Sequence, residues 1–158
     1  MRSLLLAAVI GAATTAVQAA PWQSGLLDDE ITTYYFAYQQ AENGEHRLGY
    51  ECEASSGVDV FVIETPEPYD PTTSYAPEVP TSFIIDGETI EVSGVFQDRQ
   101  GKLFVAYESF AIDGFGALFD KLLVAQSPVR VTFFDRDLSF SSEGLREAVQ
   151  PIYDECVY

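Results

Sequence analysis

Apolar and polar residues alternate along much of the chain, which is typical of strands that bury one face. In the segment 46–54, for example, Leu48, Tyr50 and Cys52 fall on the same face. Aromatic and β-branched residues, which favour strands, are frequent in these segments. The pattern predicts strands over residues 31–39, 46–54, 58–65, 81–95 (with a tight turn at Asp86-Gly87), 103–109, 129–134 and 138–140, and further turns at 97–101 and 135–137.

Two segments near the C-terminus have helical periodicity instead. The first begins at Asp113, a predicted N-cap, and ends before Pro128. The second follows a capping serine, Ser141 or Ser142, and we expect Pro151 to kink it or to leave one further turn beyond it. The apolar stripes consist of Phe115, Leu118, Phe119 and Leu122 in the first helix, and of Leu145, Ala148, Val149, Ile152 and Cys156 in the second.

The segment 66–80 departs from both patterns because it contains five prolines. Each proline lacks a backbone donor, so regular structure is not expected here. A loop of this length in a compact domain is commonly functional or covers the edge of a sheet. We therefore predict a binding site at Glu67, Tyr69, Asp70 and Tyr75, since tyrosine rings favour interfaces. The alternative is that the two tyrosines only pack the loop onto a sheet edge.

The first residues have the pattern of a secretory signal peptide. Arg2 provides a positive start, an apolar stretch of small residues follows, and 17–19 is an AxA-like cleavage site. We predict a signal peptide over residues 1–19 and a single exported globular domain over residues 20–158, located in the periplasm or secreted. No later apolar run reaches the ~20 residues of a spanning helix, so membrane insertion is not expected.

The two cysteines, Cys52 and Cys156, allow one pairing, and an exported chain with an even cysteine count favours a disulfide. Two cysteines and one distant histidine make no ligand cluster, so no metal site is predicted. Together with the strand and helix patterns, this predicts a β-rich α+β fold. We expect an antiparallel β-sandwich or a curved meander sheet, with two packed helices and one disulfide.

The charge narrows the choice of partner. The chain has 25 acidic and 8 basic residues, giving a formal net charge of −17. Nucleic acids and anionic membrane surfaces are poor partners for such a field, whereas a cationic protein would be attracted. The alternative is that the charge serves only to keep an exported protein soluble.

Candidate catalytic groups are not supported by any motif, and we predict no catalytic residue and no cofactor. His46 is the only histidine, and its neighbours supply no nucleophile, so we expect a surface or structural role. Paired carboxylates can act as acid and base where their pKa values differ. The candidate groups are residues 28–30, Glu64 with Glu67 and Asp70, and Asp135 with Asp137, although the last pair lacks the other ligands of a calcium loop.

The C-terminal run Phe140-Ser141, Gly144-Leu145, Ala148-Val149 and Cys156 has a familiar spacing. It resembles the ending of small exported bacterial proteins of the invasion-associated locus B type, and of the related accessory periplasmic proteins of type VI secretion. This resemblance implies a β-rich fold with a disulfide and a role without catalysis.

These observations leave three hypotheses about function. The first is a non-enzymatic periplasmic or secreted protein that binds a cationic protein or an envelope component. The second is an acidic inhibitor of a cationic hydrolase such as a lysozyme, acting through Tyr69 and Tyr75. The third, which we rank lowest, is a hydrolase that uses paired carboxylates.

Overall fold

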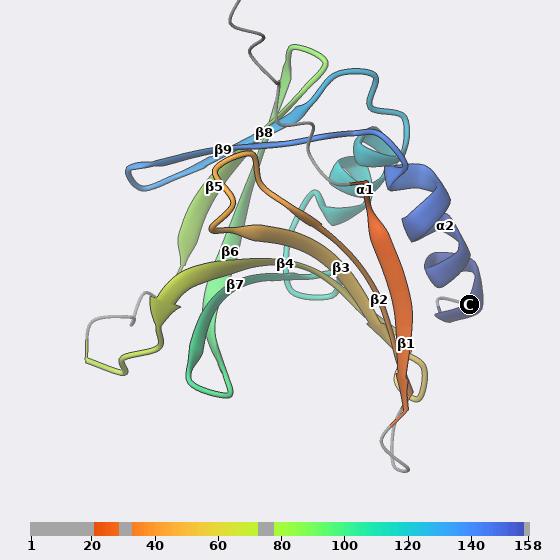
Figure 1. The fold of residues 1–158 in the computed structure, drawn as a ribbon, viewed down its shortest axis with the longest axis horizontal. Coiled ribbons are helices and arrows are strands. Elements are labelled where there is room, and N and C mark those ends of the chain that lie inside the picture. Colours follow the sequence, from red (N-terminus) through yellow and green to blue (C-terminus); the bar gives the residue numbers. More distant parts are fainter. Residues whose placement is uncertain (1–20, 29–32, 73–77, 157–158) are drawn as a thin grey trace, which may run out of the picture.

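Figure 1 shows the protein as a computed structural model that describes residues 21–28, 33–72 and 78–156. Within these residues, nine strands form an antiparallel sheet and two helices pack against it. The predicted β-rich α+β class is therefore confirmed. The elements are β1 (Gln23–Asp28), β2 (Thr33–Gln40), β3 (Arg47–Glu53), β4 (Val58–Pro68), β5 (Val79–Ile85), β6 (Glu88–Arg99), β7 (Lys102–Glu108), α1 (Phe115–Leu123), β8 (Val129–Phe133), β9 (Arg136–Phe140) and α2 (Leu145–Cys156).

The sheet has the order β1-β2-β3-β4-β7-β6-β5-β8-β9. It is a meander from β1 to β4, but β4 then pairs with β7 rather than with the next strand in the chain. Similarly, β5 pairs with β6 and β8. The expectation of a meander of consecutive strands is therefore wrong at these two places. Period-two patterns place residues on a face, and they do not say which strands are neighbours.

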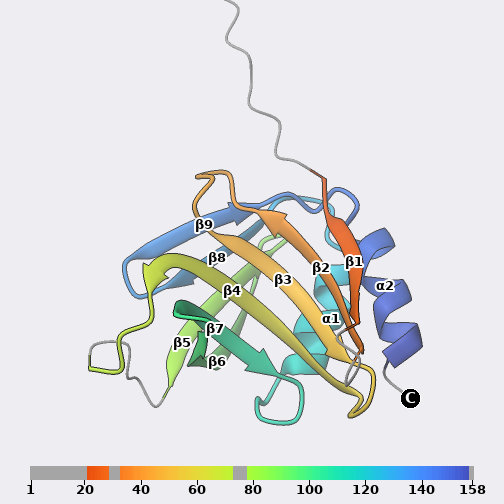
Figure 2. The same cartoon turned by 60° about the horizontal axis from the view of Figure 1, so that its bottom comes forward.

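The core lies between one face of the sheet and the two helices, which are on the same side of β1 to β3 (Figures 1 and 2). The predicted alternation accounts for it, because Tyr50 of β3 and Phe61 of β4 are at most 1% exposed. Phe119 of α1 joins them, with its ring centre 5.5 Å from that of Tyr50. It also lies 4.6 Å from the ring of Tyr153 in α2, so one aromatic cluster connects the sheet with both helices.

The two ends of the sheet are tied to each other. The backbone N–H of Glu42, after β2, donates to the carbonyl of Ser139 in β9 over 2.9 Å. The indole Nε1 of Trp22, just before β1, donates to the carbonyl of Ser141, just after β9, also over 2.9 Å. β1 and β9 are not paired in the sheet, but the sheet is curved enough for these two hydrogen bonds to join its ends.

Several strand boundaries differ from the prediction. β1 was not expected, because residues 23–28 show no clear alternation. The proline-rich segment contributes to strands at both ends, since β4 continues to Pro68 after a shift of register and β5 begins at Val79. Pro80 is tolerated in β5 because pairing with β8 starts only at Thr81.

Two hairpins are also tighter than expected. β6 continues to Arg99, which leaves the turn at Gln100-Gly101, where both residues have positive φ. β8 and β9 turn at Phe134-Asp135, so Arg136 and Asp137 belong to a strand rather than to the predicted turn.

The two helices form where their periodicity predicts, but their ends differ. The N-cap of α1 is Gly114 in the left-handed region, without a side-chain cap, so the predicted cap at Asp113 is wrong. In α2 the helix does not end at Pro151 but continues to Cys156. Pro151 is exposed, while Ile152 and Cys156 beyond it are buried, so packing holds the last turn in place.

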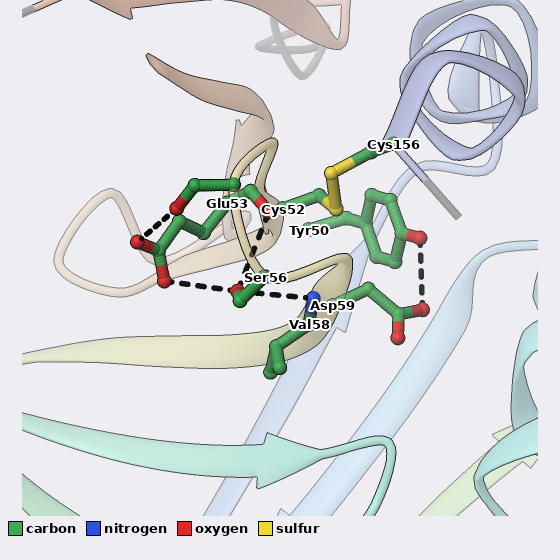
Figure 3. Close-up of a disulfide and its surroundings, with 8 residues drawn as sticks. Tyr50, Cys52, Glu53, Ser56, Val58, Asp59 and Cys156 are labelled. Atoms are coloured by element: carbon green, nitrogen blue, oxygen red, sulfur yellow. Dashed lines mark hydrogen bonds between the residues drawn. A yellow bond between two sulfur atoms is a disulfide. The ribbon is translucent and has the colours of Figure 1, made fainter. Parts of the chain in front are cut away.

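The predicted disulfide between Cys52 and Cys156 is present and joins β3 to the end of α2 (Figure 3). Beside it, the hydroxyl of Tyr50 donates to Oδ2 of Asp59 over 2.9 Å. Burial and the Asp59 carboxylate both raise the pKa of Tyr50, so its phenol stays protonated. This bond gives the buried Asp59 a partner next to the crosslink, as buried polar groups require.

Candidate functional site

The sheet has a hollow on the face that points away from the helices. Two adjoining cavities of about 560 and 290 Å³ share Phe36 and Glu51, and together we call them the outer groove. Its lining residues come from β1, β2, β3 and β4 and from the hairpin of β6 and β7. The groove is lined chiefly by Leu27 of β1, Tyr34, Phe36 and Tyr38 of β2, Arg47, Glu51 and Glu53 of β3, Val58, Val60, Val62 and Glu64 of β4, Arg99 of β6 and Phe104 of β7.

Aromatic residues at every second position of β2 form one wall of the groove. Tyr34, Phe36 and Tyr38 share the outer face, while Ala37 between them is buried on the inner face. The rings of Phe36 and Tyr38 are stacked with their centres 6.0 Å apart. The hydroxyl of Tyr38 donates to Gln23 over 2.8 Å, which fixes this ring against β1.

Gly25 of β1 makes room for this aromatic wall. A Cβ atom added to Gly25 would lie 2.6 Å from the Phe36 ring, which is closer than real contacts allow. Phe36 therefore lies directly over the backbone of β1. The glycine that weakens the strand signal of β1 thus has a packing role.

An ion pair crosses the groove from one side to the other. Arg99 of β6 pairs with Glu51 of β3, although β4 and β7 separate these strands in the sheet. The pair can form only because the sheet folds over itself. The Arg99 guanidinium also lies 5.0 Å from the centre of the Phe104 ring and donates to Oε1 of Gln97, so its plane is fixed.

A second cluster of charged side chains lies further along β3 and β4, beyond Glu51. Arg47 and Lys102 both pair with Glu64, which is largely buried. The Arg47 guanidinium lies 5.0 Å from the centre of the Tyr38 ring. Burial raises the pKa of Glu64, but hydrogen bonds from Lys102 and Arg47 outweigh it, so that the pKa lies below its usual value. Glu64 is therefore a fixed anion at neutral pH.

The predicted binding residues of the proline-rich segment are dispersed. Glu67 pairs with Arg136 of β9, and the backbone of Tyr69 donates to Gly101 at the turn between β6 and β7 over 2.9 Å. Asp70 accepts a hydrogen bond from the backbone of Thr72 over 2.8 Å. Tyr75 lies outside the described residues. The binding role assigned to this segment stays a prediction.

The candidate catalytic carboxylates are engaged in local bonds. Glu64 is paired as described, and hydrogen bonds from Arg136 and Thr65 outweigh burial and lower the pKa of Glu67. Asp137 pairs with Arg130, which lowers its pKa as well. None of these three is held protonated as a general acid would be. Residues 29 and 30 of the first candidate cluster lie outside the described residues.

His46 is buried beside the turn between β2 and β3 rather than exposed at the surface. Its side chain is 5% exposed, and its Nδ1 lies 3.0 Å from Nδ2 of Asn43 in the turn between β2 and β3. Among the described residues, no group of three His, Cys, Asp or Glu side chains is placed to hold a metal ion. No helix in the described part of the chain is long and apolar enough to cross a membrane.

A separate hollow of about 560 Å³ is lined by residues of β5, β6 and β7 and of the segment after β7. Four carboxylates line it, and the described lining residues include no lysine or arginine. Two of them are engaged, since Glu91 accepts from Ser82 over 2.8 Å and Glu108 accepts from Gln97 over 2.9 Å. The four are Glu78, Glu91, Glu108 and Asp113.

Of the outer-groove residues, the sequence analysis singled out only Glu64, and it did so as a candidate catalytic carboxylate rather than as part of a binding groove. One signal was present, because Tyr34, Phe36 and Tyr38 occupy the face of β2 opposite to Ala37 and would be polar on an ordinary solvated face. Comparison with protein-family models, with curated proteins and with solved structures gives no match for this chain.

Proposed function

We propose that this protein is an exported, non-catalytic binding protein that holds its ligand in the outer groove. The observation that carries this proposal is an apolar and aromatic lining on the solvent face of an antiparallel sheet. Such a face is ordinarily polar. Tyr34 is 38% exposed and Leu27 58% exposed, and both line the groove.

The composition of the groove suits binding. Ligand sites are concave and mostly apolar, with a few polar groups in fixed positions. Here β2 and β4 provide the apolar lining, while Arg99 and Glu51 form an ion pair across the groove. These charged groups are already paired, so the ligand does not need to arrange them.

Export is the second part of the proposal. The predicted signal peptide over residues 1–19 supports it, and the Cys52–Cys156 disulfide is consistent with an oxidising compartment. The resemblance of the C-terminal segment to small exported bacterial proteins points in the same direction and suggests an accessory role in the cell envelope.

The proposal is tested by comparing three forms of the protein as affinity baits for an envelope extract. The natural chain and a Phe110→Ala control should retain the same material, because Phe110 is exposed outside the groove lining. The double variant Tyr34→Ala/Phe36→Ala should lose it, with an unchanged circular dichroism spectrum. Equal retention by all three forms would contradict the proposal, whatever material is captured.

A second candidate is the acidic inhibitor of a cationic hydrolase, which the hollow beside β6 favours through its four carboxylates. A lysozyme assay at low salt with excess protein tests it. Inhibition that is relieved by Glu91→Gln together with Asp113→Asn would support this function. Undiminished lysozyme activity would exclude it for that enzyme class.

A further inference from the structure

We infer that the ligand of the outer groove is a neutral glycan. This inference rests on the proposed function and specifies the chemistry of the ligand. A sugar ring has a face of C–H groups and an edge of hydroxyl groups. A complementary site therefore needs aromatic rings beside carboxylate and guanidinium groups, and the groove lining has both.

The aromatic part of the site is the wall of β2. Its three rings lie two residues apart on one strand, so they follow the strand direction at intervals of about 7 Å. Phe36 and Tyr38 are nearly parallel, with an angle of 23° between their planes. Such a row can contact successive sugar units of an extended chain, and Tyr34 at its end is accessible to solvent.

The charges of the groove favour a neutral ligand. Arg47 and Arg99 of the lining stand against Glu51, Glu53 and Glu64, and Lys102, which is not part of the lining, pairs with Glu64. The charges in and beside the groove therefore offset one another, although the protein as a whole is strongly acidic. An anionic ligand would compete with the glutamates for their cations and would be repelled by the whole molecule. A cationic peptide would find Glu51 and Glu64 already paired, and Glu53 already accepting hydrogen bonds from Ser55 and Ser56.

A hydrocarbon chain also fits less well. It would remove the Arg99–Glu51 pair from water without offering any hydrogen bond in return, and such desolvation is unfavourable. Hydroxyl groups can donate to a carboxylate and accept from a guanidinium at the same time. A glycan therefore leaves this ion pair satisfied while its C–H face covers the aromatic wall.

The test is binding of the full exported chain to an array of neutral oligosaccharides, followed by titration of the best ligand by calorimetry. We expect saturable binding. Tyr34→Ala should weaken the affinity about fivefold to tenfold, because one aromatic contact is lost. Glu51→Gln should weaken it as well, since the substitution removes the charge of one hydroxyl acceptor.

Matched controls lie outside the groove. Phe110→Ala removes an exposed aromatic residue, and Asp137→Asn breaks the exposed pair with Arg130, so neither should change the affinity.

Laurate and an oligolysine peptide are tested in parallel. Binding of either one that depends on Tyr34, without glycan binding, would overturn the glycan inference and leave the groove as a site. Absence of neutral glycan binding would overturn it in any case, and the envelope capture experiment then decides the proposed function separately.

Discussion

Gly94 is the residue at which β6 passes from its pairing with β5 to its pairing with β7. A Cβ atom here would lie 2.7 Å from the ring of Tyr107 and 2.9 Å from the carbonyl oxygen of Ala106. Tyr107 cannot move aside easily, because it is buried and its hydroxyl lies 2.8 Å from Oγ1 of Thr81. These contacts leave no room for a side chain, so this position of β6 requires glycine.

We expect Gly94→Ala to lower the free energy of unfolding by about 1–3 kcal/mol through overpacking. Urea denaturation measures this change. Gly116→Ala is the matched control, since it lies in α1 with no atom near the added Cβ, and it should be neutral or stabilise the protein by up to about 1 kcal/mol. Equal stability of the two variants would show that the contact at Gly94 has been misassigned.

His46 makes the stability depend on pH. Burial lowers its pKa from the usual 6.5 and Arg136 acts in the same direction, while Glu67 and Glu45 partly oppose them. The unfolded chain therefore binds a proton at a pH where the folded protein does not. Stability is retained above about pH 6.5 and falls as the pH decreases toward the lower pKa of the folded state.

Urea denaturation between about pH 5 and pH 8 should show this fall, with a slope of at most ~1.4 kcal/mol per pH unit. His46 is the only histidine, so the His46→Gln variant should be nearly independent of pH in the upper part of this range. A natural chain that gains stability as the pH falls through 6.5 would contradict the assigned burial.

At the scale of elements, α2 depends on its covalent bond to β3. The disulfide joins residues that are 104 positions apart, and in the chain-entropy picture such a crosslink destabilises the unfolded state. It also fixes the last turn of a helix that contains Pro151. Reduction should therefore weaken both the whole fold and the docking of α2.

Thermal unfolding with and without a reductant tests this role. We expect reduction to lower the free energy of unfolding by about 2–5 kcal/mol. The double variant Cys52→Ala/Cys156→Ala should have the lower stability from the start and no response to the reductant. A natural chain that melts at the same temperature in both conditions would show that the bond contributes little.

Elements with a strong period were predictable from the sequence. Alternation identified β3 and β7, and the stripe from Leu145 to Cys156 identified α2, because each pattern follows directly from burial on one face. β1 was missed because Gly25 interrupts its pattern to accommodate Phe36. The strand ends at Pro68 and Val79 were missed because proline was interpreted as excluding strands, although edges and bulges tolerate it.

At the scale of the whole molecule, the outer groove results from contacts that no local pattern contains. Arg99 and Glu51 are 48 residues apart and lie on strands that are not neighbours. Their pairing depends on the fold of the sheet, which in turn depends on β4 pairing with β7. The sequence predicted the fold class and the disulfide, whereas the candidate site needed the strand order.

The groove also changes how the charge of the protein is understood. The net charge of −17 suggests a cationic partner, but in and beside the outer groove Arg47, Arg99 and Lys102 offset the charges of Glu51, Glu53 and Glu64. Under the proposed function, the acidic surroundings would favour solubility and exclude anions, while the groove would select its ligand by shape and by hydrogen bonding. In this proposal the groove binds the ligand, while most of the excess negative charge lies outside the groove.

Hydroxyl-radical footprinting of the intact protein, with and without the material that it retains from envelope extract, tests the assignment of the groove most directly. We expect slower oxidation of Tyr34 and Phe36 in the presence of ligand. The rates at Phe110 and Phe134, which are 72% and 62% exposed outside the groove lining, should not change. Protection of Tyr69 or Phe110 with unchanged oxidation of Tyr34 and Phe36 would place the ligand elsewhere and contradict the assignment.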